Sequence, residues 1–435
     1  MKEYTVVIQA GGMGSRMREM TGDVIPKPLL RMNGKTLIEW QMENLKEYGF
    51  HKFVIITGHL GDKIREFFGD GRDFGAEISY IEEKEPLGSA GALHYLNEMG
   101  IHTDIILIYG DVMFCVDWQR ALTFHEMAHG KATLFAHPNT HPQDSDLLEM
   151  DESGLVTAIL SKGDDRKEWV DNCVNAGLYI LERTLIASMT EGGRRDLEKD
   201  VLTTLIQERR VYAYRTPEYI KDAGTPERFM AVQEEQNRGL WKQKCLKYEQ
   251  KCVFLDRDGT LNKFKGLLNR IEDFELEIGV TDAVRSLNQS GILAIVVTNQ
   301  PVVARGMCDL EYVRKIHNKM QTLLGREGAY LDDIVFCPHH PDKGYPEENP
   351  LYKVKCHCRK PATGMIMSMV EKYHIDLDKS YMIGDSTVDV MTGMNAGLHT
   401  ILLETGQGGM DEKYNVEAEQ RFCDLKEAVE AIICD

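Results

Sequence analysis

The chain has 435 residues, too many for one ordinary hydrophobic core, so its length predicts two or three domains. Hydrophobic residues make up 43% and charged residues 28%, which is typical of a globular protein. The net charge of −18 argues against a general surface for nucleic acid or anionic membranes. No apolar run approaches the roughly 20 residues of a membrane span, and the N-terminus lacks a secretory signal, so we expect a cytoplasmic protein.

Short apolar runs alternate with helix-like stretches along the whole chain. This alternation predicts α/β architecture with largely parallel sheets. Residues 36–48 have the pattern of an amphipathic helix, and Thr225-Pro226 is a helix-start signal. The strands expected in the first half are 4–9, 53–57, 77–82, 104–109 and 131–136.

A polar stretch at residues 226–250 lacks strand character and separates the two halves. We therefore expect a first domain at 1–235, a connector helix at 236–249 and a second domain at 250–435. Apolar strands restart in the second half, at 251–255, 292–297, 333–336, 381–383 and 399–403.

A glycine-rich turn follows the first expected strand. Residues 10–16 read AGGMGSR, and such a turn lets backbone amides approach phosphate groups. Alone, the pattern is equally well explained as a tight turn, and it lacks the lysine of a Walker loop and the dinucleotide spacing. Its context strengthens the functional interpretation, because Arg16 closes the turn and residues 26–28 read PKP.

These motifs resemble the nucleoside-diphosphate-sugar pyrophosphorylase family over about residues 1–235. The resemblance implies a Rossmann-like nucleotidyltransferase with a mixed sheet, in which a sugar 1-phosphate attacks the α-phosphorus of an NTP and pyrophosphate leaves. Further motifs follow in the order of the family, namely LGSAG at 87–91, YGD at 109–111, NAG at 175–177 and DAGTP at 222–226.

The resemblance also implies a role for each matching residue. Arg16 and Lys27 neutralise the triphosphate, while Asp111 and Asp222 hold Mg²⁺. The reaction needs no covalent intermediate, so positioning and charge neutralisation carry the catalysis. Either aspartate alone is better explained as a strand-end or helix-cap residue, and the whole set of motifs favours the functional interpretation. The residues implied to bind the nucleotide or the sugar are Gly11, Gly12, Gly88, Asn175 and Lys162.

A second group of motifs begins after the strand at 251–255. Residues 256–261 read DRDGTL, and this motif resembles the first motif of the haloacid-dehalogenase-type phosphatases. The resemblance covers about residues 250–435. The later motifs appear in order, as TN at 298–299, RKP at 359–361 and GDSTVD at 384–389.

The spacing of the two aspartates suits a covalent phosphatase mechanism. Asp256 would attack phosphorus to form an aspartyl-phosphate, and Asp258 would protonate the leaving alcohol and then deprotonate water. Mg²⁺ would be held by Asp256, Asp385 and the backbone carbonyl of Asp258. The phosphate-binding residues implied by the later motifs are Thr298, Asn299 and Lys360.

The gaps between these motifs are short. About 40 residues separate Asp256 from Thr298, and about 60 separate Thr298 from Lys360. Neither gap has room for a cap domain once the core elements are counted, so we expect a capless Rossmannoid with an open site.

A cysteine-rich loop lies in the second gap. Residues 337–339 read CPH and residues 356–358 read CHC, a pattern that suits a closed tetrahedral Zn²⁺ site of structural type. His340 and His357 rank below His339 as ligands, and reduced surface thiols are the alternative. The expected ligands are Cys337, His339, Cys356 and Cys358.

This loop, the capless layout and Arg305 resemble the heptose-1,7-bisphosphate phosphatases and the related histidinol-phosphate phosphatases. Arg305 and Arg359 are then candidates for binding a second phosphate. Departures from the family patterns leave the sugar, its anomer and the role of Lys162 open. They are the DSD at 144–146 and Ser161 in the first half, and the PVV at 301–303 and Ser386 in the second. A further departure, Gln9, bears on the packing of the glycine-rich loop.

The two halves together predict consecutive steps on small-molecule substrates. The 7-phosphate of a heptose 1,7-bisphosphate would be removed, and the resulting heptose 1-phosphate would receive a nucleotidyl group. Resemblance to the heptose 1-phosphate guanylyltransferases favours GTP as the donor. Two alternatives remain, a histidinol-phosphate phosphatase in the second half and a non-catalytic nucleotide or sugar sensor in the first. The sequence leaves a homo-oligomer open and predicts neither nucleic-acid nor membrane partners.

Overall fold

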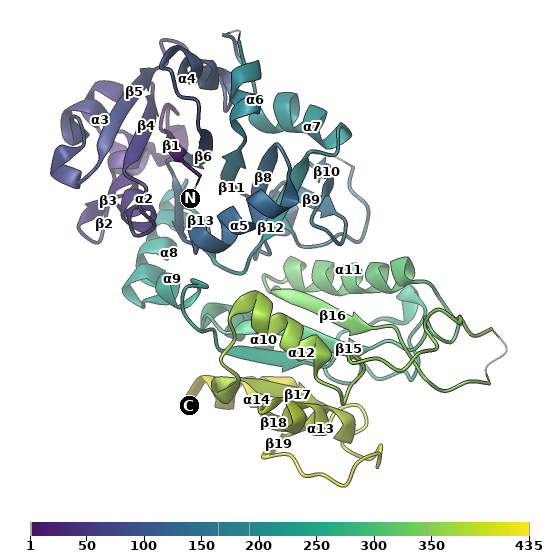
Figure 1. Ribbon diagram of the computed structural model, residues 1–435. Helices are drawn as coiled ribbons and strands as arrows, with labels where there is room; N and C mark the ends of the chain where they lie inside the picture. The colour runs from purple at the N-terminus through teal and green to yellow at the C-terminus, as the bar shows by residue number, and fades with distance from the viewer. Residues whose placement is uncertain (1, 164, 191, 345–346, 435) are drawn as a thin grey trace. The chain divides into compact units, whose positions relative to one another are not determined.

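The computed structural model of the chain describes residues 2–163, 165–190, 192–344 and 347–434 (Figure 1). The expected domains and zinc loop include Met1, Asp435 and residues 345–346, which lie outside the described residues. The chain forms two compact units. Unit 1 comprises Met1–His137, Leu148–Ser161 and Asn175–Cys245, and unit 2 comprises Pro138–Leu147, Lys162–Val174 and Leu246–Asp435.

A nine-stranded mixed sheet forms the centre of unit 1. Its first strand, β1, pairs in parallel with β4 and β6, whereas β11 pairs antiparallel to β6. The strands are β1 (Tyr4–Gln9), β4 (Lys52–Thr57), β5 (Glu77–Glu82), β6 (Asp104–Tyr109), β8 (Ala132–His137), β9 (Leu147–Met150), β10 (Val156–Leu160), β11 (Val174–Leu181) and β12 (Val211–Arg215).

Two small antiparallel pairs accompany this sheet. They are β2 (Arg31–Met32) with β3 (Lys35–Thr36), and β7 (Val112–Cys115) with β13 (Tyr219–Asp222). The sequence patterns did not indicate β7 or β13, because both are short and β7 follows β6 after only two residues. The second pair matters for function, since it places Asp222 opposite Val112.

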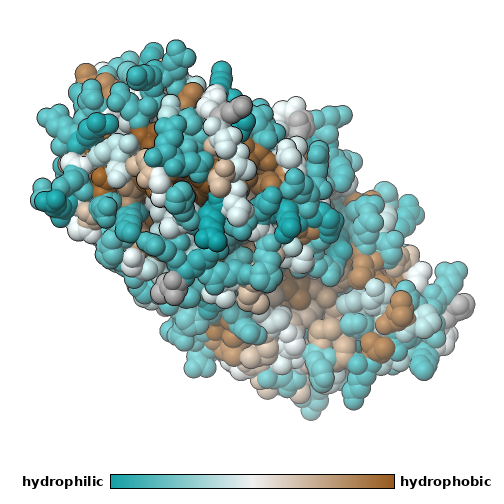
Figure 2. Space-filling model, turned by 45° about the horizontal axis from the view of Figure 1, so that its top comes forward, coloured by the Kyte–Doolittle hydropathy of each residue, from teal (hydrophilic) through white to brown (hydrophobic). Residues whose placement is uncertain are grey.

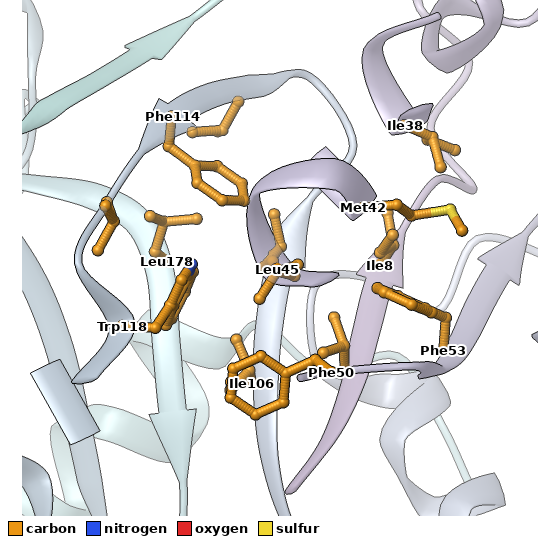
Figure 3. Packing of buried hydrophobic residues seen from close by; sticks show 14 of the residues in the cluster. Ile8, Ile38, Met42, Leu45, Phe50, Phe53, Ile106, Phe114, Trp118 and Leu178 are labelled. Carbon is orange, nitrogen blue, oxygen red and sulfur yellow. The ribbon is translucent and has the colours of Figure 1, made fainter. Parts of the chain in front are cut away.

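Apolar strand residues and one face of α2 (Leu37–Lys46) build the core shown in Figure 3. Ile8 on β1, Ile106 on β6 and Leu178 on β11 are fully buried, and Trp118 packs edge-on against Phe114. Thr36 and Glu39 form a capping box that fixes the start of α2, close to the predicted start at residue 36.

The remaining helices of unit 1 are mostly short. Thr225 caps α8 (Pro226–Asn237), as the sequence predicted. The segment 236–249 does not form one connector helix, because Gly239 has a φ of 77° and interrupts the helix before α9 (Leu240–Gln243). The others are α1 (Arg18–Thr21), α3 (Gly61–Phe68), α4 (Tyr95–Glu98), α5 (Trp118–Ala128), α6 (Arg183–Ser188) and α7 (Thr203–Gln207), with 3-10 turns η1 (Ser15–Met17) and η2 (Lys27–Leu29) and a π-helix η6 (Leu197–Leu202).

Unit 2 contains a six-stranded, all-parallel sheet with the order β16-β15-β14-β17-β18-β19. Its first strand in the chain, β14, lies between β15 and β17, so the strand order reverses there and creates a switch point at its carboxyl end. The strands are β14 (Cys252–Leu255), β15 (Leu293–Asn299), β16 (Asp333–Cys337), β17 (Tyr381–Gly384), β18 (His399–Leu403) and β19 (Gln420–Phe422).

Helices cover both faces of this sheet. Alternate residues of β14 enter different clusters, with Val253 packing on one side and Phe254 on the other. The first side is covered by α10 (Val280–Gln289), α11 (Leu310–Arg326) and α14 (Leu425–Cys434), and the second by α12 (Gly364–Tyr373) and α13 (Thr387–Ala396). The two-domain α/β fold class is thereby confirmed.

The face of the molecule drawn in Figure 2 is mostly hydrophilic, with scattered apolar residues. No helix among the described residues is long and apolar enough to span a bilayer.

Candidate active sites

The glycine-rich loop of unit 1 follows β1 directly. The amide of Ala10 donates to the Ile56 carbonyl at 2.8 Å, and Gly14 adopts a left-handed φ of 58° before η1. A side chain at Gly11 would collide with Glu83, whose Oε2 lies 2.3 Å from the added Cβ. Beside the loop is a pocket whose lining includes Gly12, Gly14, Pro26, Lys27, His59 and Leu60.

Lys27, Asp111 and Asp222 meet next to this loop. The pairing of β7 with β13 and a 2.8 Å bond from the Ala223 amide to the Asp111 carbonyl hold the two aspartates side by side. The Lys27 ammonium contacts Asp111 Oδ2. A Cβ at Gly224 would lie 3.1 Å from Lys27 Nζ and 2.4 Å from Asp222 Oδ1, so the glycine keeps this space clear.

The carboxylate of Asp222 fits a cation ligand. Arg228 donates to Oδ2 at 2.5 Å, whereas Oδ1 is buried and accepts no hydrogen bond from the described residues. A buried carboxylate oxygen left in this state is costly unless a ligand or ion completes it. Together with Asp111 it offers the oxygen donors that Mg²⁺ prefers.

The other residues predicted for the transferase lie in different settings. Arg16 is exposed on η1. Gly88 has a φ of 78°, and an added Cβ would lie 2.4 Å from the Arg195 carbonyl, so only glycine fits. Lys162 is exposed and belongs to a segment that clusters with unit 2; its amide donates to Asp146.

Glu198 is a half-buried acid that the sequence patterns did not single out. It lies on the π-helix η6, and its Oε1 accepts hydrogen bonds from the hydroxyls of Tyr109, at 3.0 Å, and Tyr179. Asn175 donates to the Tyr179 hydroxyl at 2.9 Å, and Ser89 lies 3.5 Å from Glu198 Oε2. Burial raises the pKa of Glu198. The LGSAG, YGD and NAG motifs thus meet at one carboxylate.

The phosphatase centre lies at the switch point of unit 2. Asp256 follows β14, Thr298 lies at the end of β15 and Asp385 follows β17, so parallel strands bring them to one edge. Lys360 donates to Asp256 at 2.7 Å and to Asp389 at 2.6 Å. The carboxylates of Asp256, Asp385 and Asp389 offer oxygens that all lie within 4.8 Å of one another.

This cluster has the electrostatics of a cation site. Burial raises the pKa of Asp256 to about 6, against the opposing effect of Lys360. Burial, together with the charges of Asp256 and Asp389, raises the pKa of Asp385 to about 8. One ammonium cannot balance three buried carboxylates, so the centre fits a divalent cation. Asp389 belongs to the GDSTVD motif, but the sequence alone indicated no role for it. Its position on the first turn of α13 brings it to Lys360.

Two glycines let loops approach the cluster closely. A Cβ at either Gly259 or Gly406 would lie 2.1 Å from Asp385 Oδ2. The amide of Gln407 donates to the same oxygen at 2.7 Å. The loop that contains Gly406 therefore packs directly on the cluster, and the sequence patterns gave no indication of this.

The remaining predicted residues of unit 2 hold or surround Lys360. Asn299 exchanges two hydrogen bonds with the Lys360 backbone, at 3.0 and 3.1 Å, so its amide faces that peptide. Arg359 donates to the His339 carbonyl at 3.1 Å. Burial lowers the pKa of Arg359, and the nearby charge of Arg305 acts in the same direction. The positive charges of Arg305 and Arg359 therefore repel each other.

The four zinc-ligand candidates converge. Cys358 Sγ lies 3.1 Å from Cys337 Sγ and 3.3 Å from both Cys356 Sγ and His339 Nδ1. A tetrahedron with Zn–S bonds of about 2.3 Å places its donors roughly 3.7 Å apart, so three thiols and an imidazole at these distances fit Zn²⁺. His357 is exposed and lies outside the group.

Comparison with known proteins follows this division of the chain. Residues 5–239 match a family model described as nucleotidyl transferase, and residues 357–428 match one described as HAD-hydrolase-like. A Yersinia pestis D-glycero-beta-D-manno-heptose-1,7-bisphosphate 7-phosphatase is 39% identical over 36% of this chain and 81% of the relative. Its Photorhabdus laumondii counterpart is 38% identical over 42% of this chain and 96% of the relative. The crystal structure of HddC from Yersinia pseudotuberculosis is 25% identical over 54% of this chain and all of that one, with a TM-score of 0.46.

Proposed function

The chain belongs to the nucleotidyl transferase family through residues 5–239, and its second half belongs to the family of the heptose-1,7-bisphosphate 7-phosphatases, and we propose that it catalyses two consecutive steps toward a nucleotide-heptose. The first step removes the 7-phosphate of a D-glycero-D-manno-heptose 1,7-bisphosphate. The second joins the heptose 1-phosphate to a nucleotide. The observation that carries the proposal is that one chain contains both family regions, and that each region holds a cluster of charged side chains suited to its reaction.

In the phosphatase step, an Asp256 oxygen attacks phosphorus, and the bond from phosphorus to the sugar oxygen breaks. Asp258 gives its proton to the leaving alkoxide. Water then attacks the aspartyl-phosphate, Asp258 takes its proton, and inorganic phosphate leaves. Lys360 lies 2.7 Å from Asp256 and reduces the repulsion between this carboxylate and the phosphate dianion.

The cofactors we propose are Mg²⁺ at both centres and one structural Zn²⁺. Mg²⁺ held by Asp256, Asp385 and the carbonyl of Asp258 supplies charge neutralisation in the phosphatase, and Asp389 lies close enough to support it. In unit 1 the corresponding ligands are Asp111 and Asp222. Zn²⁺ bound by Cys337, His339, Cys356 and Cys358 orders the loop that carries Arg359.

In the transfer step, an oxygen of the sugar 1-phosphate attacks the α-phosphorus of the NTP and pyrophosphate leaves. Arg16 and Lys27 offset the charge of the two anionic reactants. Gly11, Gly12 and Gly88 leave room for the nucleotide, and Asn175 and Lys162 contact the sugar. We propose GTP as the donor and the cytoplasm as the location, where ten cysteines without disulfides are expected to be stable.

The test is mass spectrometry of products formed from each anomer of heptose 1,7-bisphosphate with an equimolar mixture of four NTPs and Mg²⁺. We expect inorganic phosphate, pyrophosphate and GDP-heptose. Faster phosphate release from histidinol phosphate would overturn the heptose assignment. If no NTP gave pyrophosphate with heptose 1-phosphate, the first half would act as a sensor and the transferase assignment would be wrong.

A further inference from the structure

Arg257 lies between the two aspartates of the DRDGT motif, and its side chain is completely buried, with an exposed fraction of 0%. It lies in a bend that follows β14, which ends at Leu255. A buried guanidinium is costly unless it is paired, as is any desolvated ion. Its partners therefore indicate its function.

The guanidinium of Arg257 joins Asp258 to a histidine on α11. Its Nη2 donates to the two Asp258 oxygens at 2.9 and 2.7 Å. Its Nη1 lies 3.2 Å from His317 Nε2. Nε makes no hydrogen bond to any part of the chain that the structure describes, so the group is held from its Nη atoms alone.

His317 must be the acceptor in this contact, because a guanidinium has only donors. The imidazole is 4% exposed and packs edge-on against Phe336, with ring centroids 5.2 Å apart. Burial, with the charges of Arg257 and Arg314, lowers the pKa of His317 well below its ordinary value. The ring therefore stays neutral and keeps a lone pair for Arg257.

The other side of the Asp258 carboxylate is held by two amides. Gln300 Nε2 donates to Oδ2 at 2.8 Å, and Asn262 Nδ2 donates to Oδ1 at 3.1 Å. The Asp258 side chain is still 17% exposed, although its four donor bonds come from buried groups. The carboxylate is thus fixed by three buried side chains and remains partly exposed.

We propose that Arg257 and His317 are positioning residues for the acid–base step, in which His317 accepts a hydrogen bond from Arg257 and thereby fixes the guanidinium that orients Asp258. The proposal rests on the proposed phosphatase function and deepens it. It does not depend on the identity of the sugar. Proton transfer by a positioned side chain contributes about 10²- to 10⁴-fold, so loss of orientation should cost a measurable part of that factor.

The experiment compares two leaving groups in the full-length protein with Mg²⁺. An alkoxide leaving group needs a proton from Asp258, whereas p-nitrophenolate leaves without one. The variants are His317→Leu, which removes the acceptor, and His317→Gln, whose side-chain carbonyl restores it. The measurement is the first-turnover release of alcohol from heptose 1,7-bisphosphate, by rapid quench, and of p-nitrophenolate from p-nitrophenyl phosphate.

We expect His317→Leu to slow first-turnover release from the sugar phosphate about 10- to 100-fold, with KM unchanged, and to leave p-nitrophenolate release within about twofold. His317→Gln should restore most of the loss. Arg257→Lys keeps the positive charge but removes the planar guanidinium that donates to both Asp258 oxygens, so it should show the same selective defect. The matched control is His399→Leu, which removes an exposed histidine bonded to Glu419 and should change neither rate.

Equal losses of rate on both substrates would mean that Arg257 and His317 only support the fold, and this result would overturn the proposal. Full activity of Arg257→Lys on the sugar phosphate would also overturn it. If His317→Leu does not fold, judged by circular dichroism, Arg257→Lys decides alone. If the wild type prefers histidinol phosphate, the heptose assignment fails. Histidinol phosphate, which is also an alkyl ester, then replaces the heptose substrate. The comparison of leaving groups still decides this proposal.

Discussion

The pKa of Asp385 is raised more than that of Asp256, because Asp385 is buried beside two other carboxylates. Its pKa rises to about 8 and that of Asp256 to about 6, whereas both are about 3.9 in an unfolded chain. These two carboxyl groups therefore bind more protons in the folded metal-free protein than in the unfolded one between about pH 4 and 8. The stability that they contribute is highest at the acidic end of this range and falls as the pH rises.

A divalent cation should remove this penalty. We expect Mg²⁺ to raise the melting temperature of unit 2 more at pH 8 than at pH 5.5, because at pH 8 it replaces repulsion between ionised carboxylates. The measurement is thermal unfolding with Mg²⁺ or with EDTA at both pH values. Asp385→Asn should flatten the pH dependence without metal. An equal effect of Mg²⁺ at both pH values would contradict the prediction.

Lys360 holds the same cluster together from the opposite side. Its side chain is 3% exposed and bonds both Asp256 and Asp389. Replacing it with methionine should abolish phosphatase turnover, because nothing then reduces the repulsion between Asp256 and the phosphate dianion. In the metal-free protein it should lower the free energy of unfolding by about 3–5 kcal/mol, the cost of breaking a buried ion pair.

The control for Lys360→Met is Lys372→Met in the same unit. Lys372 also bonds an aspartate, Asp333, but its side chain is 42% exposed, so its loss should cost about 0–1 kcal/mol. Urea unfolding followed by circular dichroism measures both variants. Similar losses of unfolding free energy in the two variants would show that burial does not determine the strength of the ion pairs of Lys360.

At the scale of elements, the segment from the end of β16 to Lys360 carries all four zinc-ligand candidates. Removing zinc should disorder this segment, because bound Zn²⁺ would join its two ends and its binding free energy contributes to folding. We expect about one zinc per chain by elemental analysis. A strong chelator or Cys356→Ser should release it and lower phosphatase activity, while nucleotidyl transfer is retained.

The control for this prediction is Cys423→Ser, which changes an exposed cysteine outside the loop. Zinc content and both activities should stay at the wild-type level in that variant. Full zinc content in Cys356→Ser would show that the four-ligand assignment is wrong.

The elements that the sequence predicted best are those with a strong local signal. The apolar run at 104–109 coincides with β6, and Thr225-Pro226 begins α8. Elements that depend on distant partners were missed, such as the four-residue strands β7 and β13, which exist because they pair with each other. Gly239 illustrates a third case, since a polar stretch looked helical throughout although a single left-handed residue divides it.

The same distinction applies to the candidate sites. The nucleophile, the zinc ligands and the metal-binding aspartates stand in motifs whose spacing is local, so they could be named from the sequence; their roles stay predictions. Glu198, Arg257 and His317 could not be named, because their importance comes from hydrogen bonds between segments far apart in the chain. A lone histidine or glutamate carries no pattern in one sequence.

At the scale of the whole molecule, the chain carries two centres that share no residue. Asp111 and Lys27 belong to unit 1, whereas Asp256 and Lys360 belong to unit 2. If each centre carries one reaction, one substitution in each should separate the activities. Asp256→Asn removes the nucleophile's charge and should abolish phosphate release while nucleotidyl transfer to heptose 1-phosphate continues.

Asp111→Asn should have the opposite effect. It removes a carboxylate that faces Lys27 and the proposed Mg²⁺ site, so transfer should fall by at least about 100-fold, a loss typical of a removed electrostatic group. Phosphate release should remain at the wild-type rate. With heptose 1,7-bisphosphate and GTP, Asp256→Asn alone should yield no GDP-heptose and Asp111→Asn alone very little. An equimolar mixture of the two should restore it, because heptose 1-phosphate released by one can be used by the other. Failure of the mixture, with each single activity intact, would mean that the intermediate does not leave the chain that makes it.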